Sequence, residues 1–346
     1  MKYKQLGQTG LYVSEICLGT MTFTGDNKAA GMWAAIGDVG QKQATEIVEK
    51  SVKAGVNFLD TADVYSAGQS ERLTGQAIKD LGLKRSAVVI ATKCYGRMGP
   101  GVNDIGASRG HIMDSVSRSL ERLGTDHIDL YQIHATDTVT PVEETMRALE
   151  DLTRQGMVRY VGCSNWQAWR VMKANGYAAA RGWARMETIQ SYYSIAGRDL
   201  EREIVPMITD QKVGLMVWSP LAGGLLSGKF GPGSNGPEGA RRVAFDFPPV
   251  DKDRAWKCVD AMREIGNKHG VSVARVALAY VLHKPFTMSV IIGAKNIEQL
   301  DDNLEAAKLV LSADEIKTLD EASALPPEYP GWMVSRQGAE RVPQPK

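Results

Sequence analysis

The sequence has 346 residues, a length that fits either two average domains or a single α/β barrel with insertions. Its 41 lysines and arginines nearly balance its 40 aspartates and glutamates, so the net charge of +1 does not indicate a nucleic-acid partner or an acidic membrane surface. This balance is more typical of a protein that acts on small, weakly charged molecules.

The cysteines and the amino terminus indicate where the protein works. The cysteines are far apart and form no Cys-x-x-Cys pair, so we expect reduced thiols in the core at Cys17, Cys94, Cys163 and Cys258. Residues 1–5 lack the apolar stretch of a signal peptide, and no run reaches the roughly 20 apolar residues that span a bilayer. We therefore expect a cytoplasmic protein without an export signal or a membrane anchor.

The first part of the chain predicts a hairpin, a strand, a long loop and a helix. Residues 1–14 alternate loosely around a Gly-Gln-Thr-Gly turn, which is typical of a hairpin, and this hairpin would close the bottom of a barrel. Residues 16–20 form an apolar run of strand length, and residues 21–40 form a long loop of the kind that tends to be functional. Residues 41–54 have helical periodicity and end at Gly55.

Strand-like and helical stretches then alternate along the chain. The next apolar run begins at Asn57 and continues into a polar turn that ends at Tyr65. Further strands are predicted at residues 87–93, 128–134, 160–164, 188–192, 215–218 and 290–293. Helices are predicted at residues 71–81, 108–124, 140–155, 251–270 and 273–282, and a final one begins near residue 312.

Capping residues mark several of these helix starts. Ser108 is a predicted N-cap, and Ser312 with Glu315 forms a predicted capping box. Thr140 to Glu143 reads as a second capping box, with proline at the first helical position.

The alternation predicts a closed (β/α)8 barrel. Eight strand-like runs, each followed by a helical stretch, recur at intervals near the roughly 30 residues of a β-α unit. An open doubly wound sheet is the alternative, but the chain lacks its Gly-rich first turn. We expect one domain over residues 1–346, with the hairpin 1–14, an insertion after strand seven at residues 222–250 and a Pro-rich tail at residues 324–346.

Four polar residues at the strand ends predict the reacting centre. Asp60, Lys93 and His134 end strands two, three and four, and Tyr65 lies in the turn after Asp60. A barrel brings such positions together at one face. Lys93 would lower the pKa of the Tyr65 phenol, Asp60 would keep Lys93 charged, and His134 would orient a carbonyl oxygen. Each residue alone is equally well explained as a satisfied polar group at a strand end, but four of them at one face favour catalysis.

The strongest candidate for a phosphate site follows strand eight. Residues 231–236 match GxGxxG and residues 223–229 match GxxxxGK, but the first lies in a loop and the second lacks the following Ser or Thr, so neither indicates an ATPase. Gly293 and Lys295 precede Asn296, a good N-cap, so free backbone N–H groups and a lysine would meet at the start of a helix.

Taken together, the strand-end motifs resemble those of the aldo-keto reductases. The matching motifs are Asp60-Thr61-Ala62-Asp63-Val64-Tyr65, Thr92-Lys93, Tyr131-Gln132-Ile133-His134, Gly162-Cys163-Ser164-Asn165, Trp218-Ser219-Pro220-Leu221 and Gly293-Ala294-Lys295 to Asn303. They span nearly the whole chain in the family's order. The long loop, the tail and the double helix before strand eight are similar to the longer-chain branch that includes the potassium-channel β subunits.

The resemblance implies a coenzyme site without a metal. It implies that Ser164, Asn165 and Gln190 hold the carboxamide, that Trp218 lies against the nicotinamide, and that Thr20 and Met21 also contact the coenzyme. Residues that would line the pyrophosphate are Ser219, Pro220, Leu221, Gly223, Lys229 and Arg241, and those that would hold the adenosine end are Gly293, Lys295, Gln299 and Asn303. Many members have an arginine near the 2′-phosphate; the matching residue here is Lys295, which binds as a point charge. Trp33 and Tyr95 would line the substrate pocket.

The resemblance implies reduction of an aldehyde or ketone by NADPH, with NADH as the less favoured coenzyme. Tyr65 would be the general acid, Lys93 and Asp60 its tuning pair, and His134 the residue that orients the carbonyl. Two alternatives remain: a coenzyme-binding, redox-sensing subunit like the channel β subunits, and a barrel aldolase or isomerase with Lys93 as a Schiff-base nucleophile. The channel subunits lack a histidine at the end of strand four, so His134 favours an enzyme that works on small molecules, as a monomer or an oligomer.

Overall fold

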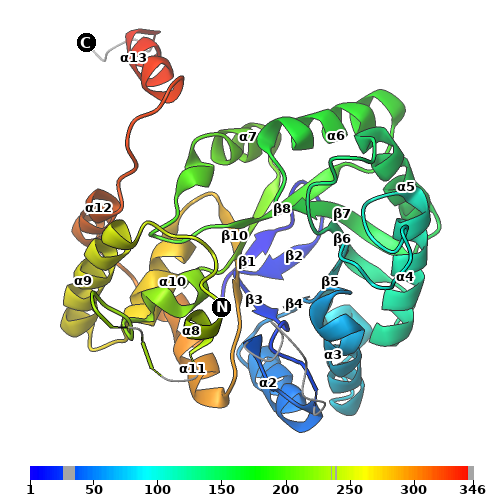
Figure 1. Ribbon diagram of the computed structural model, residues 1–346, viewed down its shortest axis with the longest axis horizontal. Coiled ribbons are helices and arrows are strands. Elements are labelled where there is room, and N and C mark those ends of the chain that lie inside the picture. The colour runs from blue at the N-terminus through cyan, green and yellow to red at the C-terminus, as the bar shows by residue number, and fades with distance from the viewer. Residues whose placement is uncertain (26–35, 235, 238–239, 342–346) are drawn as a thin grey trace.

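Eight parallel strands close into a barrel, as the sequence predicts (Figure 1). The computed structural model describes residues 1–25, 36–234, 236–237 and 240–341. The barrel strands are β3 (Ile16–Gly19), β4 (Phe58–Asp60), β5 (Val89–Cys94), β6 (Ile128–Ile133), β7 (Val158–Ser164), β8 (Met186–Tyr192), β9 (Gly214–Trp218) and β10 (Thr287–Ile292). Neighbours in sequence pair with one another, and β10 pairs with β3 to close the ring.

Helices surround the barrel and connect its strands (Figure 1). They are α2 (Gln41–Lys53), α3 (Gln69–Asp80), α4 (Arg109–Leu123), α5 (Val142–Arg154), α6 (Ala168–Arg181), α7 (Ile204–Gln211), α8 (Arg241–Ala244), α9 (Lys252–His269), α10 (Val273–His283), α11 (Ile297–Glu305), α12 (Ala313–Ala322) and α13 (Gly331–Arg341). The predicted N-caps Ser108 and Asn296 accept hydrogen bonds from the first turns of α4 and α11, and Ser312 forms its capping box with Glu315.

The predicted capping box at Thr140 is wrong. The residue before α5 is Pro141, and no side chain caps this helix. The Thr140 hydroxyl donates to the Asp137 carboxylate at 2.8 Å instead, and the same carboxylate accepts from two backbone N–H groups in this loop. Helix α5 begins one residue later than predicted, so Pro141, which has no side-chain acceptor, occupies the N-cap position in place of Thr140.

The amino-terminal hairpin forms the floor of the barrel, as predicted. Strands β1 (Tyr3–Gln5) and β2 (Tyr12–Ser14) pair antiparallel, and Leu6 and Val13 at their turn side are fully buried. These two side chains pack against buried side chains of the barrel strands: Cys17, Phe58, Val89, Ala91, Leu130, Met216 and Met288. Apolar groups thus close this end of the barrel interior.

Alternation along the strands places polar side chains above this floor. Side chains two residues apart on a strand point to the same face. Phe58, Ala91 and Leu130 belong to the floor, so Asp60, Lys93 and Gln132 point into the barrel one layer higher. The sequence therefore fixes a polar layer on top of an apolar one.

Two segments differ from plain loops. The insertion after β9 contains the short helices η4 (Ala222–Ser227) and α8. The described part of the Pro-rich tail contains helix α13. In Figure 1 α13 lies away from the barrel, connected by an extended segment.

Two glycines inside helices test the packing of the outer layer. A Cβ atom on Gly75 of α3 would clash with the carbonyl oxygen of Leu123 at the end of α4, whereas one on Gly176 of α6 would meet nothing within 4 Å. We expect Gly75→Ala to lower the free energy of unfolding by about 1–3 kcal/mol. Gly176→Ala, the matched control, should raise it by about 0.5–1 kcal/mol because alanine favours the helix. Urea unfolding followed by circular dichroism measures both, and a gain for Gly75→Ala would contradict this packing.

Candidate active site

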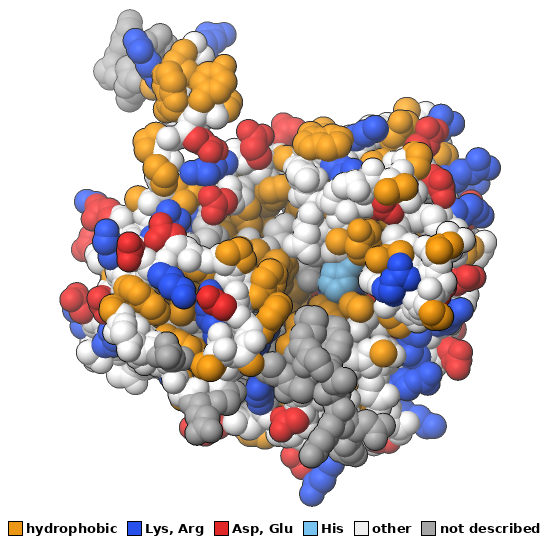
Figure 2. All heavy atoms as spheres, in the orientation of Figure 1, with side chains coloured by type: hydrophobic (Ala, Val, Ile, Leu, Met, Phe, Trp, Pro, Cys, Tyr) orange, Lys and Arg blue, Asp and Glu red, His pale blue; other side chains and the backbone are white. Residues whose placement is uncertain are grey.

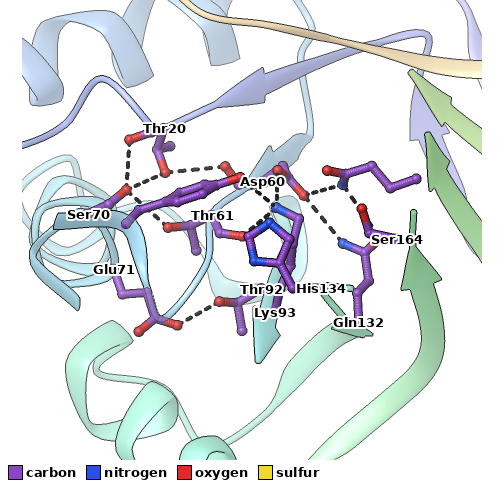
Figure 3. A network of polar contacts seen from close by, with 12 residues as sticks. Thr20, Asp60, Thr61, Ser70, Glu71, Thr92, Lys93, Gln132, His134 and Ser164 are labelled. Atoms are coloured by element: carbon purple, nitrogen blue, oxygen red, sulfur yellow. Dashed lines mark hydrogen bonds and ion pairs between the residues drawn. The ribbon is translucent and has the colours of Figure 1, made fainter. Parts of the chain in front are cut away.

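The predicted catalytic residues lie together at the carboxyl ends of three adjacent strands (Figure 3). Asp60 ends β4, Lys93 lies one residue before the end of β5, and His134 directly follows β6. Strand β5 pairs with both β4 and β6, so these ends are neighbours in the ring. The space-filling view shows that the surface is hollowed near the centre of the ring (Figure 2).

Lys93 is fully buried, and its three ammonium protons all have acceptors. Its Nζ lies 2.6 Å from Asp60 Oδ2, 2.8 Å from the carbonyl oxygen of Thr61 and 3.3 Å from the hydroxyl oxygen of Tyr65. A buried charge is tolerated only when it is paired and hydrogen-bonded in this way. The ammonium group therefore joins the carboxylate to the phenol.

Two glutamines complete the coordination of Asp60. The Gln190 side-chain amide donates to Asp60 Oδ1 at 2.9 Å, and the Gln132 amide lies 3.4 Å from the same oxygen. The resemblance implies that Gln190 holds the coenzyme carboxamide, and it implies no role for Gln132. Strand alternation could have identified Gln132 as a residue of the site. It follows Leu130 of the apolar floor by two residues and therefore points into the barrel.

Tyr65 is held by an unusual turn of the backbone. It begins the short helix η1 (Tyr65–Gly68), in which Ser66 and Ala67 have φ values of 48° and 54°. Residues other than glycine rarely adopt this left-handed conformation. The turn brings the Tyr65 ring edge to face against the His134 imidazole, with ring centroids 5.7 Å apart, and places Lys93 Nζ 4.9 Å from the Tyr65 ring centroid.

Burial decides the protonation of this cluster. Burial raises the pKa of Tyr65 above its ordinary value, and the opposing effect of the Lys93 ammonium group is smaller. Lys93 does lower the pKa of this phenol, as the sequence analysis expects, but burial outweighs this contribution and the net shift is upward. Burial alone would lower the pKa of Lys93, but the Asp60 carboxylate and the Tyr65 hydroxyl together raise it above its ordinary value. At neutral pH the cluster contains a protonated phenol beside an ammonium group.

His134 is neutral in the same environment. Burial, with a smaller contribution from the Lys93 charge, lowers its pKa to about 3. A neutral imidazole retains one N–H donor and adds no charge next to Lys93. It can therefore donate a hydrogen bond to a bound oxygen at any ordinary pH.

A second polar layer, which sequence reasoning missed, fixes the end of β5 from outside the barrel. Glu71 of α3 is fully buried and accepts from the Thr92 hydroxyl at 2.6 Å (Figure 3). It also accepts from Arg122 Nε of α4 at 2.6 Å. Thr92 is the residue before Lys93, so this contact fixes the strand end that carries the ammonium group. The signal was a glutamate on the same helix face as Leu73 and Thr74, where a charged residue needs a partner.

The comparison with known proteins decides the family. The model of the Aldo/keto reductase family matches residues 15–324 of this chain. The chain belongs to the aldo/keto reductase family. A versiconal hemiacetal acetate reductase from Aspergillus parasiticus is 34% identical over 96% of this chain and 99% of the relative. The uncharacterized oxidoreductase YrpG of Bacillus subtilis is 37% identical, over 96% of this chain and 100% of the relative. A probable voltage-gated potassium channel subunit beta of Arabidopsis thaliana is 35% identical, over 90% and 92%.

Family membership and the reductase-named relatives support carbonyl reduction on small molecules in general terms. Aldo/keto reductases use nicotinamide coenzymes. Among the described residues, no helix combines the length and the apolar character needed to cross a membrane.

The residues assigned to the nicotinamide end lie around the mouth of the barrel. Asn165 has a left-handed φ of 58°; its amide nitrogen donates to the His134 carbonyl at 3.2 Å, and its oxygen accepts from Trp218 Nε1 at 3.0 Å. Ser164 is buried and also contacts the Asn165 amide, at 3.0 Å. Trp218 belongs to an aromatic cluster with Tyr192, at 5.3 Å, and with a parallel Phe247, at 5.8 Å between ring centroids.

The segment after β9 turns tightly and carries an arginine. Ser219 and Gly223 both have positive φ, and a Cβ atom on Gly223 would clash with the Phe247 carbonyl. Pro220 is buried, Leu221 is half-buried and Lys229 is exposed. Nε of Arg241 is buried and has no hydrogen-bond partner among the described residues. Backbone turns beside a guanidinium whose Nε lacks a partner among the described residues fit an anionic group such as a pyrophosphate.

Asn296 caps the start of α11, where the sequence predicts an anion site. Asn296 accepts from the Gln299 N–H at 2.9 Å, and the Gln299 side chain in turn accepts from the Lys295 N–H at 2.9 Å. Asn303 donates to the Gly293 carbonyl at 3.2 Å. Gln299 and Asn303 therefore hold the loop between β10 and α11, and Lys295 belongs to this loop, directly before a helix end that favours anions.

The remaining predicted residues fall in different places. Thr20 is fully buried, with its hydroxyl 3.2 Å from the Asp60 carbonyl and 2.8 Å from the Ser70 hydroxyl, so its side chain belongs to the structural layer below the mouth (Figure 3). Met21 and Tyr95 are half-buried beyond the ends of β3 and β5. Trp33, the other predicted pocket residue, lies outside the described residues.

Asp63, two residues before Tyr65, is a fully buried carboxyl group. Its backbone N–H donates to the Lys93 carbonyl at 3.1 Å. Burial, followed by the nearby charge of Glu71, raises the pKa of Asp63 to about 8. The folded protein therefore keeps a proton on Asp63 at pH values where an ordinary aspartate has lost it.

We expect Asp63 to make stability depend on pH. In the unfolded chain Asp63 ionises near pH 4, so the folded state loses relative stability as pH rises from there towards about 8. Asp63→Asn removes this proton linkage. The free energy of unfolding of the variant, minus that of the unmodified protein, should therefore increase by about 1.4 kcal/mol for each pH unit across this window. Urea unfolding at several pH values measures the difference. The exposed Glu264→Gln is the control and should run parallel to the unmodified protein; a parallel curve for Asp63→Asn would refute the protonated state.

Proposed function

We propose that this aldo/keto reductase reduces an aldehyde or ketone to an alcohol, with NADPH as the preferred coenzyme and NADH as a less favoured one. The observation that carries the proposal is the placement of Lys93 Nζ, 2.6 Å from the Asp60 carboxylate and 3.3 Å from the Tyr65 hydroxyl, beside a neutral His134. This arrangement suits the transfer of a proton to an oxygen held at the mouth of the barrel.

Each residue has a distinct part in the proposed reaction. Bound NADPH supplies a hydride to the carbonyl carbon. Tyr65, protonated at neutral pH because burial raises its pKa, gives its proton to the carbonyl oxygen. Lys93 stabilises the phenolate that Tyr65 becomes, and Asp60 balances the charge of Lys93. His134 donates a hydrogen bond to the same oxygen and so orients the carbonyl.

The coenzyme would lie across the mouth of the barrel. Asn165 and Ser164 would hold the carboxamide near Trp218, with the Gln190 side-chain oxygen as a further acceptor. Arg241 and the turns at Ser219 and Gly223 would bind the pyrophosphate, and the start of α11 would bind the adenosine end, where Lys295 would meet the 2′-phosphate.

The alternatives are less well supported by the same contacts. A Schiff-base mechanism needs a neutral, accessible amine, whereas Lys93 is fully buried, ion-paired and has a raised pKa. A coenzyme-binding sensor is favoured by one observation, the potassium channel subunit beta among the relatives. It would bind NADPH but show little steady-state turnover.

We expect Tyr65→Phe to lower kcat by about 10²–10⁴-fold because the proton donor is lost. Binding of NADPH, followed by fluorescence titration, should be nearly unchanged. Tyr12→Phe, in the exposed hairpin at the other end of the barrel, is the control and should keep full activity. Near-normal turnover in Tyr65→Phe would remove this residue from the mechanism, and NADPH binding without turnover in the unmodified protein would favour the sensor.

We expect Lys295→Met to weaken NADPH binding by about tenfold and to leave NADH binding unchanged, since a charged contact to a phosphate contributes about 1.5 kcal/mol. The exposed Lys268→Met in α9 serves as the control for a general loss of positive charge. Equal weakening of both coenzymes would show that Lys295 does not contact the 2′-phosphate.

A further inference from the structure

A cavity of about 390 Å³ lies beside α4, and the proposed mechanism does not use it. Its walls come from the β5–α4 loop, from one face of α4 and from Asp63; Ser108, His111, Ser115 and Arg118 follow one another on that helix face. Helices α3 and α4 are neighbours in the outer layer (Figure 1). We call this cavity the α4 pocket. Its volume falls in the range of small-molecule sites.

Asp63 is the one fully buried acid in the lining of the α4 pocket. Its side chain is 0% exposed, and both carboxyl oxygens are without a hydrogen-bond partner among the described residues. The amide of Val64 makes only a loose polar contact that does not reach hydrogen-bond geometry. Buried polar groups are nearly always satisfied, so a carboxyl group that lines a cavity without a partner indicates that a ligand or water completes it.

The surrounding charges favour a cation over an anion. Glu71 acts on Asp63 more strongly than either of the opposing charges, Arg122 or Lys93. The guanidinium of Arg122 is already paired with Glu71 at 2.6 Å, and Nζ of Lys93 with Asp60. Burial lowers the pKa of His111, so its imidazole is neutral at pH 7.

The outer lining of the α4 pocket has nearly balanced charge. Asp104 and Asp114 contribute two carboxylates and Arg118 one guanidinium; Asp114 and Arg118 are exposed. A positive group at the base of the pocket would therefore meet Asp63 without facing an unpaired cation there.

We propose that the α4 pocket binds a small organic cation of the guanidinium or ammonium class, whose charged end contacts the Asp63 carboxylate. Ser108, Ser115 and Asn103 offer hydroxyl and amide groups for its polar atoms, and Met98 offers an apolar contact. Binding of a cation requires the ionised form of Asp63, so each bound cation displaces one proton.

The test compares methylguanidinium with methylurea, a neutral molecule of nearly the same shape. Isothermal titration calorimetry with the full chain measures affinity, and backbone NMR shifts at Asp63 and His111 locate the site. We expect methylguanidinium to bind and methylurea to bind at least tenfold more weakly. Equal binding of both, binding elsewhere, or no binding because the pocket holds only water would overturn the proposal.

Two substitutions distinguish binding in the α4 pocket from a non-specific attraction of the cation to the protein. Asp63→Asn should weaken methylguanidinium binding at least tenfold. Gly110→Leu adds a side chain to a lining position whose Cβ has open space around it, so it should obstruct the pocket without disturbing packing. Glu264→Gln on α9 is the control and should bind as the unmodified protein does. Undiminished binding in both Asp63→Asn and Gly110→Leu would overturn the site.

The pH dependence gives an independent readout. Because the probe keeps its charge throughout, its affinity should rise about tenfold per pH unit below about 8 and level off above that pH. Asp63→Asn should abolish this slope. A flat profile in the unmodified protein would exclude Asp63 as the contact.

Discussion

The buried ion pair between Lys93 and Asp60 is the constraint on which the rest of the site depends. Charges this deep in a protein are tolerated only when every donor and acceptor has a partner, and here each ammonium proton does. Gln190 and Gln132 satisfy the remaining carboxylate oxygen. The phenol of Tyr65 completes the ammonium coordination, so the proposed proton donor is also part of what makes the buried charge acceptable.

Strand periodicity made the fold and the location of the reacting centre predictable. The apolar runs of β3 to β10 each carry buried side chains on both faces, and their polar ends come together once the ring closes. The contact between Glu71 and Arg122 was not predictable in the same way, because it depends on how α3 packs against α4. The net pKa shift of Tyr65 was missed because it depends on the extent of burial, which one sequence does not reveal.

The helix caps were also predictable only in part from the local sequence. Ser108, Asn296 and Ser312 cap their helices as predicted because each stands directly before its helix and accepts from an N–H group of the first turn. Thr140 does not, because α5 begins only at Val142 and Pro141 takes the N-cap position, while the Thr140 hydroxyl donates to Asp137. The contacts of Thr20 and Gln190 with Asp60 are likewise tertiary, because they join residues that are distant in the sequence.

Because the hairpin closes one end of the barrel, the reacting centre is open to solvent at the other end only. Among the described residues, Leu6 and Val13 fill the axis at this end, so anything that reaches Asp60 and Lys93 must arrive and leave through the opposite opening. Under the proposed function, the coenzyme and the carbonyl compound both enter through that one opening. Whichever molecule sits deeper has to enter first and depart last, so the architecture itself imposes an order on the catalytic cycle.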